Sequence, residues 1–148
     1  MSLADVHLLL VEDDPNDVEL ILRALRRLHL ADRVFVVRDG AEALDFLFAS
    51  GPFSPRHSAD VPKVVLLDLK LPKLHGFDVL ERLRADPRTC HIPVVALSSS
   101  REDSDVQRSY ALGVNSYVVK PVEAEKFAET VSQLGLYWAL LNQTPRSF

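Results

Sequence analysis

The sequence predicts an α/β fold in which a parallel sheet carries helices on both of its faces. Five short apolar runs alternate along the chain with segments whose apolar residues recur at helical spacing. The central runs are continuously apolar, which is typical of parallel strands buried on both faces. The chain has 148 residues, enough for one domain with a substantial core.

The predicted strands are the five apolar runs, which contain many β-branched residues. They are residues 6–11, 33–38, 64–68, 92–97 and 116–119. Strands that alternate with helices are expected to run parallel, giving a doubly wound (βα)5 arrangement. The flavodoxin-like strand order 2-1-3-4-5 is a common solution for five such strands, although periodicity alone does not decide the order.

The helical segments have recognisable starts and ends. Pro15 stands where the first helix begins, and Asp14 or Asn16 can cap it. Asp86 ends the third because a residue before proline disfavours helix, and Gly113 closes the fourth. The helices are expected at residues 15–28, 41–48, 77–86, 102–112 and from about 123 onward.

Residues 50–62 form the one long loop that the sequence predicts. The segment contains Gly51 and three prolines and has little apolar content, so we expect it to lie at the surface. It is longer than most connections in compact α/β units. We interpret it as an insertion that is either neutral or used for contacts.

Composition excludes several classes of protein. A net charge of −4 gives no nonspecific attraction to nucleic acid or to anionic membrane. No apolar run approaches the length of about 18 residues that spans a membrane, and the first residues lack the pattern of a secretory signal. The single cysteine, Cys90, excludes an internal disulfide. We therefore expect a cytoplasmic protein that binds neither nucleic acid nor membrane.

Polar side chains follow four of the five predicted strands. They are the acidic run Glu12, Asp13 and Asp14, the single carboxylate Asp68, the hydroxyl of Ser98 and the ammonium of Lys120. Each alone is consistent with an ordinary strand-ending turn. Because the carboxyl ends of parallel strands meet at one edge of a sheet, the whole set is expected to gather at a single crevice.

This set of groups suits a magnesium ion and a phosphate. Clustered carboxylates repel each other and favour a cation, and a site made only of oxygen donors favours Mg²⁺ over zinc. A lysine and a hydroxyl can neutralise and hydrogen-bond phosphate oxygens, and a carboxylate can accept a phosphoryl group as an aspartyl phosphate. Asp68 is the natural nucleophile because it is a single carboxylate that faces a pair.

In these motifs the sequence resembles the receiver domains of two-component response regulators. The motifs are Val-Glu-Asp-Asp at residues 11–14, Leu-Asp-Leu-Lys-Leu-Pro at residues 67–72, Ser98, and Lys-Pro at residues 120–121. The resemblance covers residues 6 to about 134. It implies a single receiver domain at residues 1–148, whose C-terminal helix extension covers about residues 135–148.

The resemblance implies a role for each residue around the crevice. Asp68 would be the phosphoacceptor. Asp13 would hold Mg²⁺ directly, Glu12 would hold it through water, and Lys70 would contribute its backbone carbonyl.

The resemblance also implies a set of switch residues. Ser98 would move toward the phosphoryl group together with the aromatic switch Tyr117, and Lys120 would pair with the phosphate. The Lys120–Pro121 peptide bond is often cis in this family.

The implied partner is a sensor histidine kinase. The C-terminal segment and the 50–62 loop resemble single-domain regulators that serve phytochrome kinases. Residues 134–141 are apolar on more than one helical face, which favours a homodimer through the last helix and the fifth strand. The alternative is that this tail folds back on its own domain.

The expected function is therefore that of a stand-alone response regulator, a signalling switch rather than a turnover enzyme. Phosphorylation would change the face formed by the fourth helix, the fifth strand and the fifth helix, for dimerisation or partner binding. An alternative is a haloacid-dehalogenase-type phosphatase, but that family needs a second Asp where this chain has Lys70. A degenerate receiver that only binds proteins is a third hypothesis.

Overall fold

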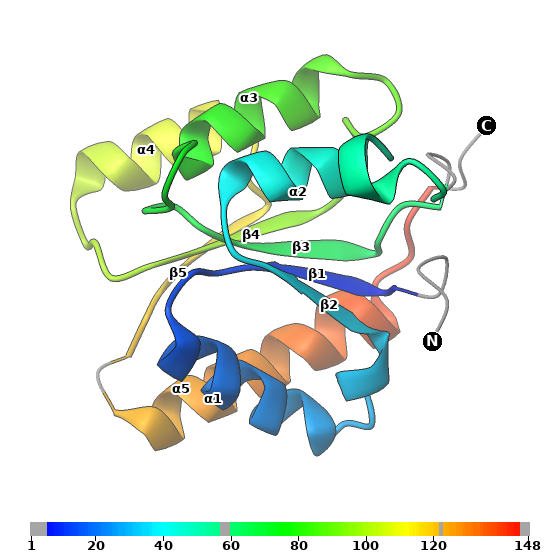
Figure 1. The fold of residues 1–148 in the computed structure, drawn as a ribbon. Helices are drawn as coiled ribbons and strands as arrows, with labels where there is room; N and C mark the ends of the chain where they lie inside the picture. The colour runs from blue at the N-terminus through cyan, green and yellow to red at the C-terminus, as the bar shows by residue number, and fades with distance from the viewer. Residues whose placement is uncertain (1–5, 57–59, 122, 146–148) are drawn as a thin grey trace.

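Five parallel strands form one sheet in the order β2-β1-β3-β4-β5, which confirms the predicted order (Figure 1). The computed structural model describes residues 6–56, 60–121 and 123–145. The strands are β1 (Leu8–Val11), β2 (Val34–Val37), β3 (Val64–Asp68), β4 (Val94–Ser98) and β5 (Ser116–Val119). In the register of the sheet, Asp68 lies opposite Leu97 and Ser98 lies opposite Val119, so both polar residues reach the same edge.

Helices cover both faces of the sheet. Figure 1 shows α1 (Pro15–Arg26) and α5 (Ala124–Leu134) side by side on one face. The other face carries α2 (Gly40–Leu47), α3 (Gly76–Ala85) and α4 (Asp103–Ala111). Short 3₁₀ turns occupy Ala31–Arg33 and Gly51–Phe53.

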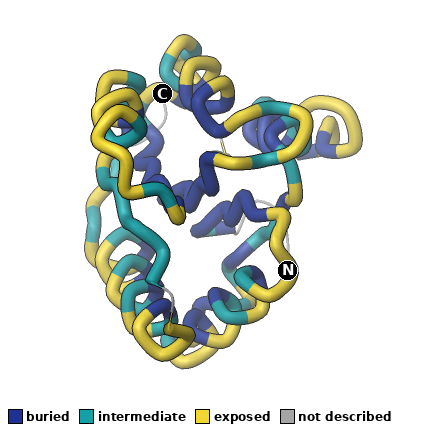
Figure 2. The backbone as a smooth tube through the Cα atoms, turned by 90° about the vertical axis from the view of Figure 1, so that its left-hand side faces the viewer, coloured by how far each residue is buried: buried dark blue, intermediate teal, exposed yellow. Residues whose placement is uncertain are grey.

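The core is divided by the sheet into two apolar layers. Every residue of β1, β3 and β4 is buried, because these strands are covered by helices above and below (Figure 2). The edge strands β2 and β5 are only partly buried. This explains why the three central strands have the most continuous apolar sequences.

The turn from β1 into α1 is fixed by a capping residue. Asp14 Oδ1 accepts hydrogen bonds from the backbone N–H groups of Asn16, at 2.9 Å, and Asp17, at 3.5 Å. Pro15 is the first residue of the helix. Asp14 therefore stabilises the helix start, and Glu12 and Asp13 are left at the sheet edge.

The prediction that residues 50–62 lie at the surface holds for most of those that the structure describes but is wrong for Phe53, Arg56 and Pro62. Phe53 is buried, and its ring packs edge-on against those of Phe35 and Phe46, at centroid distances of 5.5 and 5.3 Å. The Arg56 guanidinium lies 4.4 Å from the centroid of the Phe46 ring. The Phe53 ring and the Arg56 side chain therefore hold a segment rich in Gly and Pro against the core. Residues 57–59 lie outside the described parts.

The C-terminal segment packs on its own domain through one side, as the alternative hypothesis expected, and the homodimer stays a prediction. α5 continues into a π-helix, η4 (Gly135–Leu141), whose Gly135 and Ala139 are buried against the α1 side of the core. The opposite side of η4 is exposed and carries four large apolar residues: Leu136, Tyr137, Leu140 and Leu141. The tail thus folds back on its own domain and still presents an apolar surface.

Two further expectations concern the Lys120–Pro121 peptide bond and membrane-spanning helices. The residues that the structure describes contain no cis peptide bond, so the expected cis Lys120–Pro121 bond is trans. Trans is the lower-energy isomer of an X–Pro bond by about 0.5–1 kcal/mol. Within the described residues, no helix is long and apolar enough to cross a membrane.

Candidate functional site

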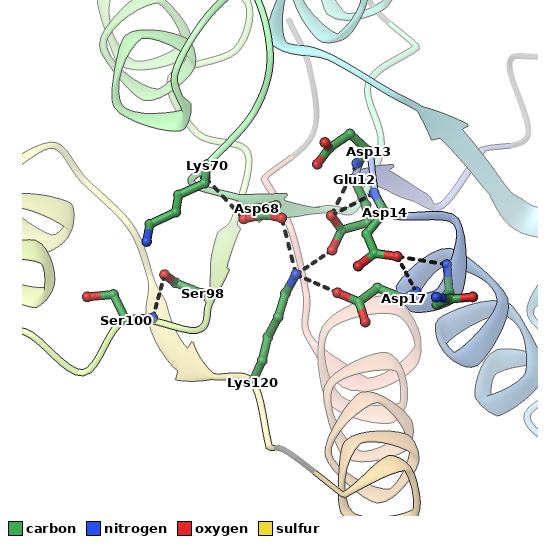
Figure 3. Close-up of polar contacts among 10 residues, drawn as sticks. Glu12, Asp13, Asp14, Asp17, Asp68, Lys70, Ser98, Ser100 and Lys120 are labelled. Atoms are coloured by element: carbon green, nitrogen blue, oxygen red, sulfur yellow. Dashed lines mark hydrogen bonds and ion pairs between the residues drawn. The ribbon is translucent and has the colours of Figure 1, made fainter.

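Two of the strand-end carboxylates, Glu12 and Asp68, contact the ammonium of Lys120 (Figure 3). Lys120 Nζ lies 2.5 Å from Glu12 Oε1, 3.1 Å from Asp68 Oδ2 and 2.9 Å from Asp17 Oδ2. The lysine follows β5, Glu12 follows β1 and Asp68 ends β3. Residues more than 50 positions apart in sequence are therefore joined at one point, as the strand-end pattern predicted.

Three carboxylates form the acidic part of the site. Glu12, Asp13 and Asp68 each offer one oxygen, and these oxygens lie within 4.8 Å of one another. Glu12 and Asp68 are buried, whereas Asp13 is exposed. Glu12 Oε2 also accepts the backbone N–H of Asp13 at 3.1 Å, which holds the carboxylate in the turn.

The environment shifts the ionisation of two groups. The pKa of Glu12 is raised to about 8, chiefly by burial and then by the hydrogen bond and charge of Asp68, while Lys120 acts in the opposite direction. Burial lowers the pKa of Lys120, but its hydrogen bonds to Glu12 and Asp17 outweigh this, so the net shift is upward. Three carboxyl groups thus share the single ammonium of Lys120.

The loop after β3 wraps around Asp68. Asp68 Oδ1 accepts the backbone N–H of Lys70 at 3.1 Å, and the Lys70 side chain is exposed. Gly76 donates its N–H to the Leu69 carbonyl at 2.8 Å, which closes the loop onto the start of α3. One oxygen of Asp68 is therefore held by backbone and the other by Lys120. The metal role of the Lys70 carbonyl stays a prediction.

Ser98 and Tyr117 are linked through Ser100. The buried Ser98 Oγ accepts the Ser100 N–H at 3.1 Å, and the Tyr117 hydroxyl donates to the Ser100 carbonyl at 3.0 Å. Ser100 Oγ donates to Asp105 Oδ2 in α4 at 2.6 Å. The loop after β4 therefore connects the site edge to α4 and β5, and the expected switch roles stay predictions.

Asp17 is a site residue that the sequence analysis missed. It lies in the first turn of α1, where an acidic residue is commonly explained by the helix dipole. A signal was present, because the first turn of this helix begins at the sheet edge that collects the other acids. Asp14, by contrast, serves as the cap and makes its side-chain hydrogen bonds within α1.

The donor set fits a magnesium ion. The clustered groups are carboxylate oxygens from Glu12, Asp13 and Asp68, the donors that Mg²⁺ prefers. Glu12 and Asp68 are both buried and share a single ammonium, that of Lys120, which leaves their oxygens suited to a further cation. An exposed member, Asp13, leaves the cluster open to solvent on one side.

Comparisons with known proteins agree with this geometry. The family model of the response regulator receiver domain matches residues 8–132. The response regulator Rcp1 of Synechocystis sp. is 35% identical over 133 residues, covering 88% of this chain and 87% of Rcp1. A structure of the Mn²⁺-bound form of Rcp1 superposes with a TM-score of 0.83, at 32% identity over 93% of this chain and 97% of that one.

Two other solved structures are similar along most of the chain. The phosphorylated cyanobacterial phytochrome response regulator RcpA has a TM-score of 0.86 at 36% identity, covering 93% of this chain and 96% of RcpA. The bacteriophytochrome response regulator RtBRR is 54% identical with a TM-score of 0.73, covering 93% of this chain and 82% of RtBRR.

Proposed function

Because the chain belongs to the response regulator receiver domain family, we propose that it accepts a phosphoryl group on Asp68 from a sensor histidine kinase. The observation that carries this proposal is the position of Asp68, held between the Lys70 N–H and the Lys120 ammonium beside two further acids. Its similarity to regulators associated with phytochromes makes a bacteriophytochrome kinase the proposed donor.

The transfer step uses groups that already surround Asp68. A carboxylate oxygen of Asp68 forms a bond to phosphorus while the P–N bond of the donor phosphohistidine breaks, and the released imidazole takes up a proton from solvent. Lys120 Nζ, 3.1 Å from Asp68 Oδ2, donates to the phosphoryl oxygens. Mg²⁺, when held by Glu12, Asp13 and Asp68, supplies positive charge that offsets the charge of the phosphoryl oxygens.

The proposed response starts from the link between Ser98 and Ser100. A phosphoryl group adds a charge of about −1.5 to −2 at pH 7 and attracts the Ser98 hydroxyl, which now accepts the Ser100 N–H. Because Tyr117 and Asp105 both hold Ser100, a movement of this loop reaches β5 and α4. We propose that the face formed by α4, β5 and α5 changes in this way.

We further propose that the exposed side of η4 mediates homodimerisation. Leu136, Tyr137, Leu140 and Leu141 are each 45% or more exposed and lie within one helical segment next to α5. Such a contiguous apolar surface favours pairing with a second copy. Light scattering should show a dimer that Leu140→Lys with Leu141→Lys converts to monomer, whereas Tyr110→Lys on α4 leaves it dimeric.

Several negative expectations belong to the same proposal. The protein acts as a switch and does not turn over substrate, because the position two residues after Asp68 is an exposed lysine and not the acid that a haloacid-dehalogenase-type phosphatase needs. A net charge of −4 favours neither nucleic acid nor anionic membrane as a partner. A cytoplasmic location follows from a kinase partner that draws on ATP.

The experiment that tests phosphoryl acceptance is intact-mass measurement after incubation with phosphoramidate and Mg²⁺. One added phosphoryl group in the parent, absent after chelation of the metal and absent from Asp68→Asn, supports the proposal. Asp14→Asn is the matched control, because it removes one nearby carboxylate and retains a capping residue. Equal uptake by Asp68→Asn would contradict it.

A further inference from the structure

Lys120 uses all of its hydrogen-bond donors on carboxylates. An ammonium has three N–H groups, and Nζ has three partners at 2.5, 2.9 and 3.1 Å, namely Glu12, Asp17 and Asp68. Figure 3 shows the ammonium lying between these side chains. The lysine side chain is only 13% exposed and that of Asp17 23%. Solvent therefore screens the Lys120–Asp17 pair only in part.

Asp17 differs from the other two partners. Glu12 and Asp68 belong, with Asp13, to the group of oxygens that could hold a cation, and Asp17 does not. A divalent cation that takes Glu12 and Asp68 competes with Lys120 for both of them. Asp17 is then the one partner of Lys120 that does not also bind the cation.

We propose that Asp17 is a positioning residue, which retains the Lys120 ammonium beside Asp68 while the other two carboxylates turn to the metal. This inference rests on the proposed function and extends it to a residue of α1. By holding Lys120 through its own charge, Asp17 reduces the competition between the ammonium and the cation. It also keeps a positive charge within reach of the phosphoryl group on Asp68.

The surrounding structure fixes Asp17 for this task. Its backbone N–H donates to the Asp14 cap at 3.5 Å, so its position in the first turn of α1 is set by the helix start. α1 packs along α5, the helix that begins four residues after Lys120. Asp17 thus lies in α1, and the Lys120 backbone is held at the sheet edge by its N–H bond to the Ser98 carbonyl at 2.8 Å.

The test is the Mg²⁺ dissociation constant measured by isothermal titration calorimetry, without any phosphodonor. Asp17→Asn should raise this constant by about three- to fivefold relative to the matched control Asp14→Asn, the upper range expected for losing one ion pair that solvent screens in part. Asp14→Asn removes the same charge from the same helix turn but touches no lysine. Asp17→Glu, which retains a carboxylate, should restore affinity toward the parent value.

A double-mutant cycle separates positioning from simple charge. In a Lys120→Met background the difference between Asp17→Asn and Asp14→Asn should disappear, because no ammonium is left to compete with the cation. Equal constants for the two variants in the parent background, or a difference that persists without Lys120, would overturn the inference alone. A parent protein that binds no Mg²⁺ would instead overturn the proposed function on which the inference rests.

Discussion

Gly76→Ala adds a methyl group that should displace the backbone around Asp68, which a substitution at an exposed position should not do. A Cβ at this position would lie 2.7 Å from Leu69 Cα and 2.9 Å from the Asp68 carbonyl oxygen. Both are backbone atoms of the segment that carries the acceptor. Overpacking of this kind costs about 1–3 kcal/mol, partly offset by up to about 1 kcal/mol from the lower entropy of the unfolded alanine chain.

The assay combines thermal unfolding with phosphorylation by phosphoramidate. At roughly 2–4 °C per kcal/mol for a chain of this size, Gly76→Ala should melt a few degrees below the parent and take up phosphate more slowly. Gly135→Ala is the matched control, since its Cβ would also meet an atom at 2.7 Å, but that atom is the flexible tip of Leu25. It should phosphorylate at the parent rate. Parent-like melting and phosphorylation of Gly76→Ala would refute the reasoning.

Three further predictions follow from single contacts. The pKa of Glu12 is about 8 in the folded protein, against 4.5 unperturbed, so the free energy of unfolding of the metal-free protein should fall by about 1.4 kcal/mol per pH unit as the pH rises between these values. Urea unfolding in the presence of a chelator measures this slope, and Glu12→Gln should remove it. Phe53→Ala should lower the free energy of unfolding by about 3 kcal/mol, whereas a loss near zero in the same assay would mean that the loop does not pack. Asp105→Ala, which removes the acceptor of the Ser100 hydroxyl, should change the phosphorylation rate by up to about tenfold. An equal change in Asp103→Ala would assign the effect to the helix charge.

The fold could be predicted from the sequence because its signals are local and repeated. β1, β3 and β4 are buried along their whole length, and each appears in the sequence as an uninterrupted apolar run. The strand-end position of Asp68 follows from the same pattern, since a parallel sheet brings the ends of its strands to one edge. The sequence alone therefore predicted that the acidic run after β1 would lie close to Asp68 and Lys120.

The features that were missed depend on contacts between distant segments. Asp17 resembles an acid that serves the helix dipole, and its one signal in the sequence was its place in the first turn of a helix that begins at the acidic sheet edge. Its contact with Lys120, which follows β5, depends on tertiary packing. The burial of Phe53 depends on Phe35 in another element, so composition alone did not indicate that this residue of the loop is buried. The tail was ambiguous because its residues serve two surfaces, one buried through Ala139 and one exposed through Leu141.

The measurement that tests the central claim most directly is the location of the phosphoryl group. Borohydride reduces an aspartyl phosphate to homoserine, so peptide mapping after phosphorylation and reduction identifies the acceptor by residue. The position of Asp68 between Lys70 and Lys120 predicts homoserine at position 68 alone, and only when Mg²⁺ is present. Homoserine at Asp13 or Asp17 with position 68 unmodified would contradict the account.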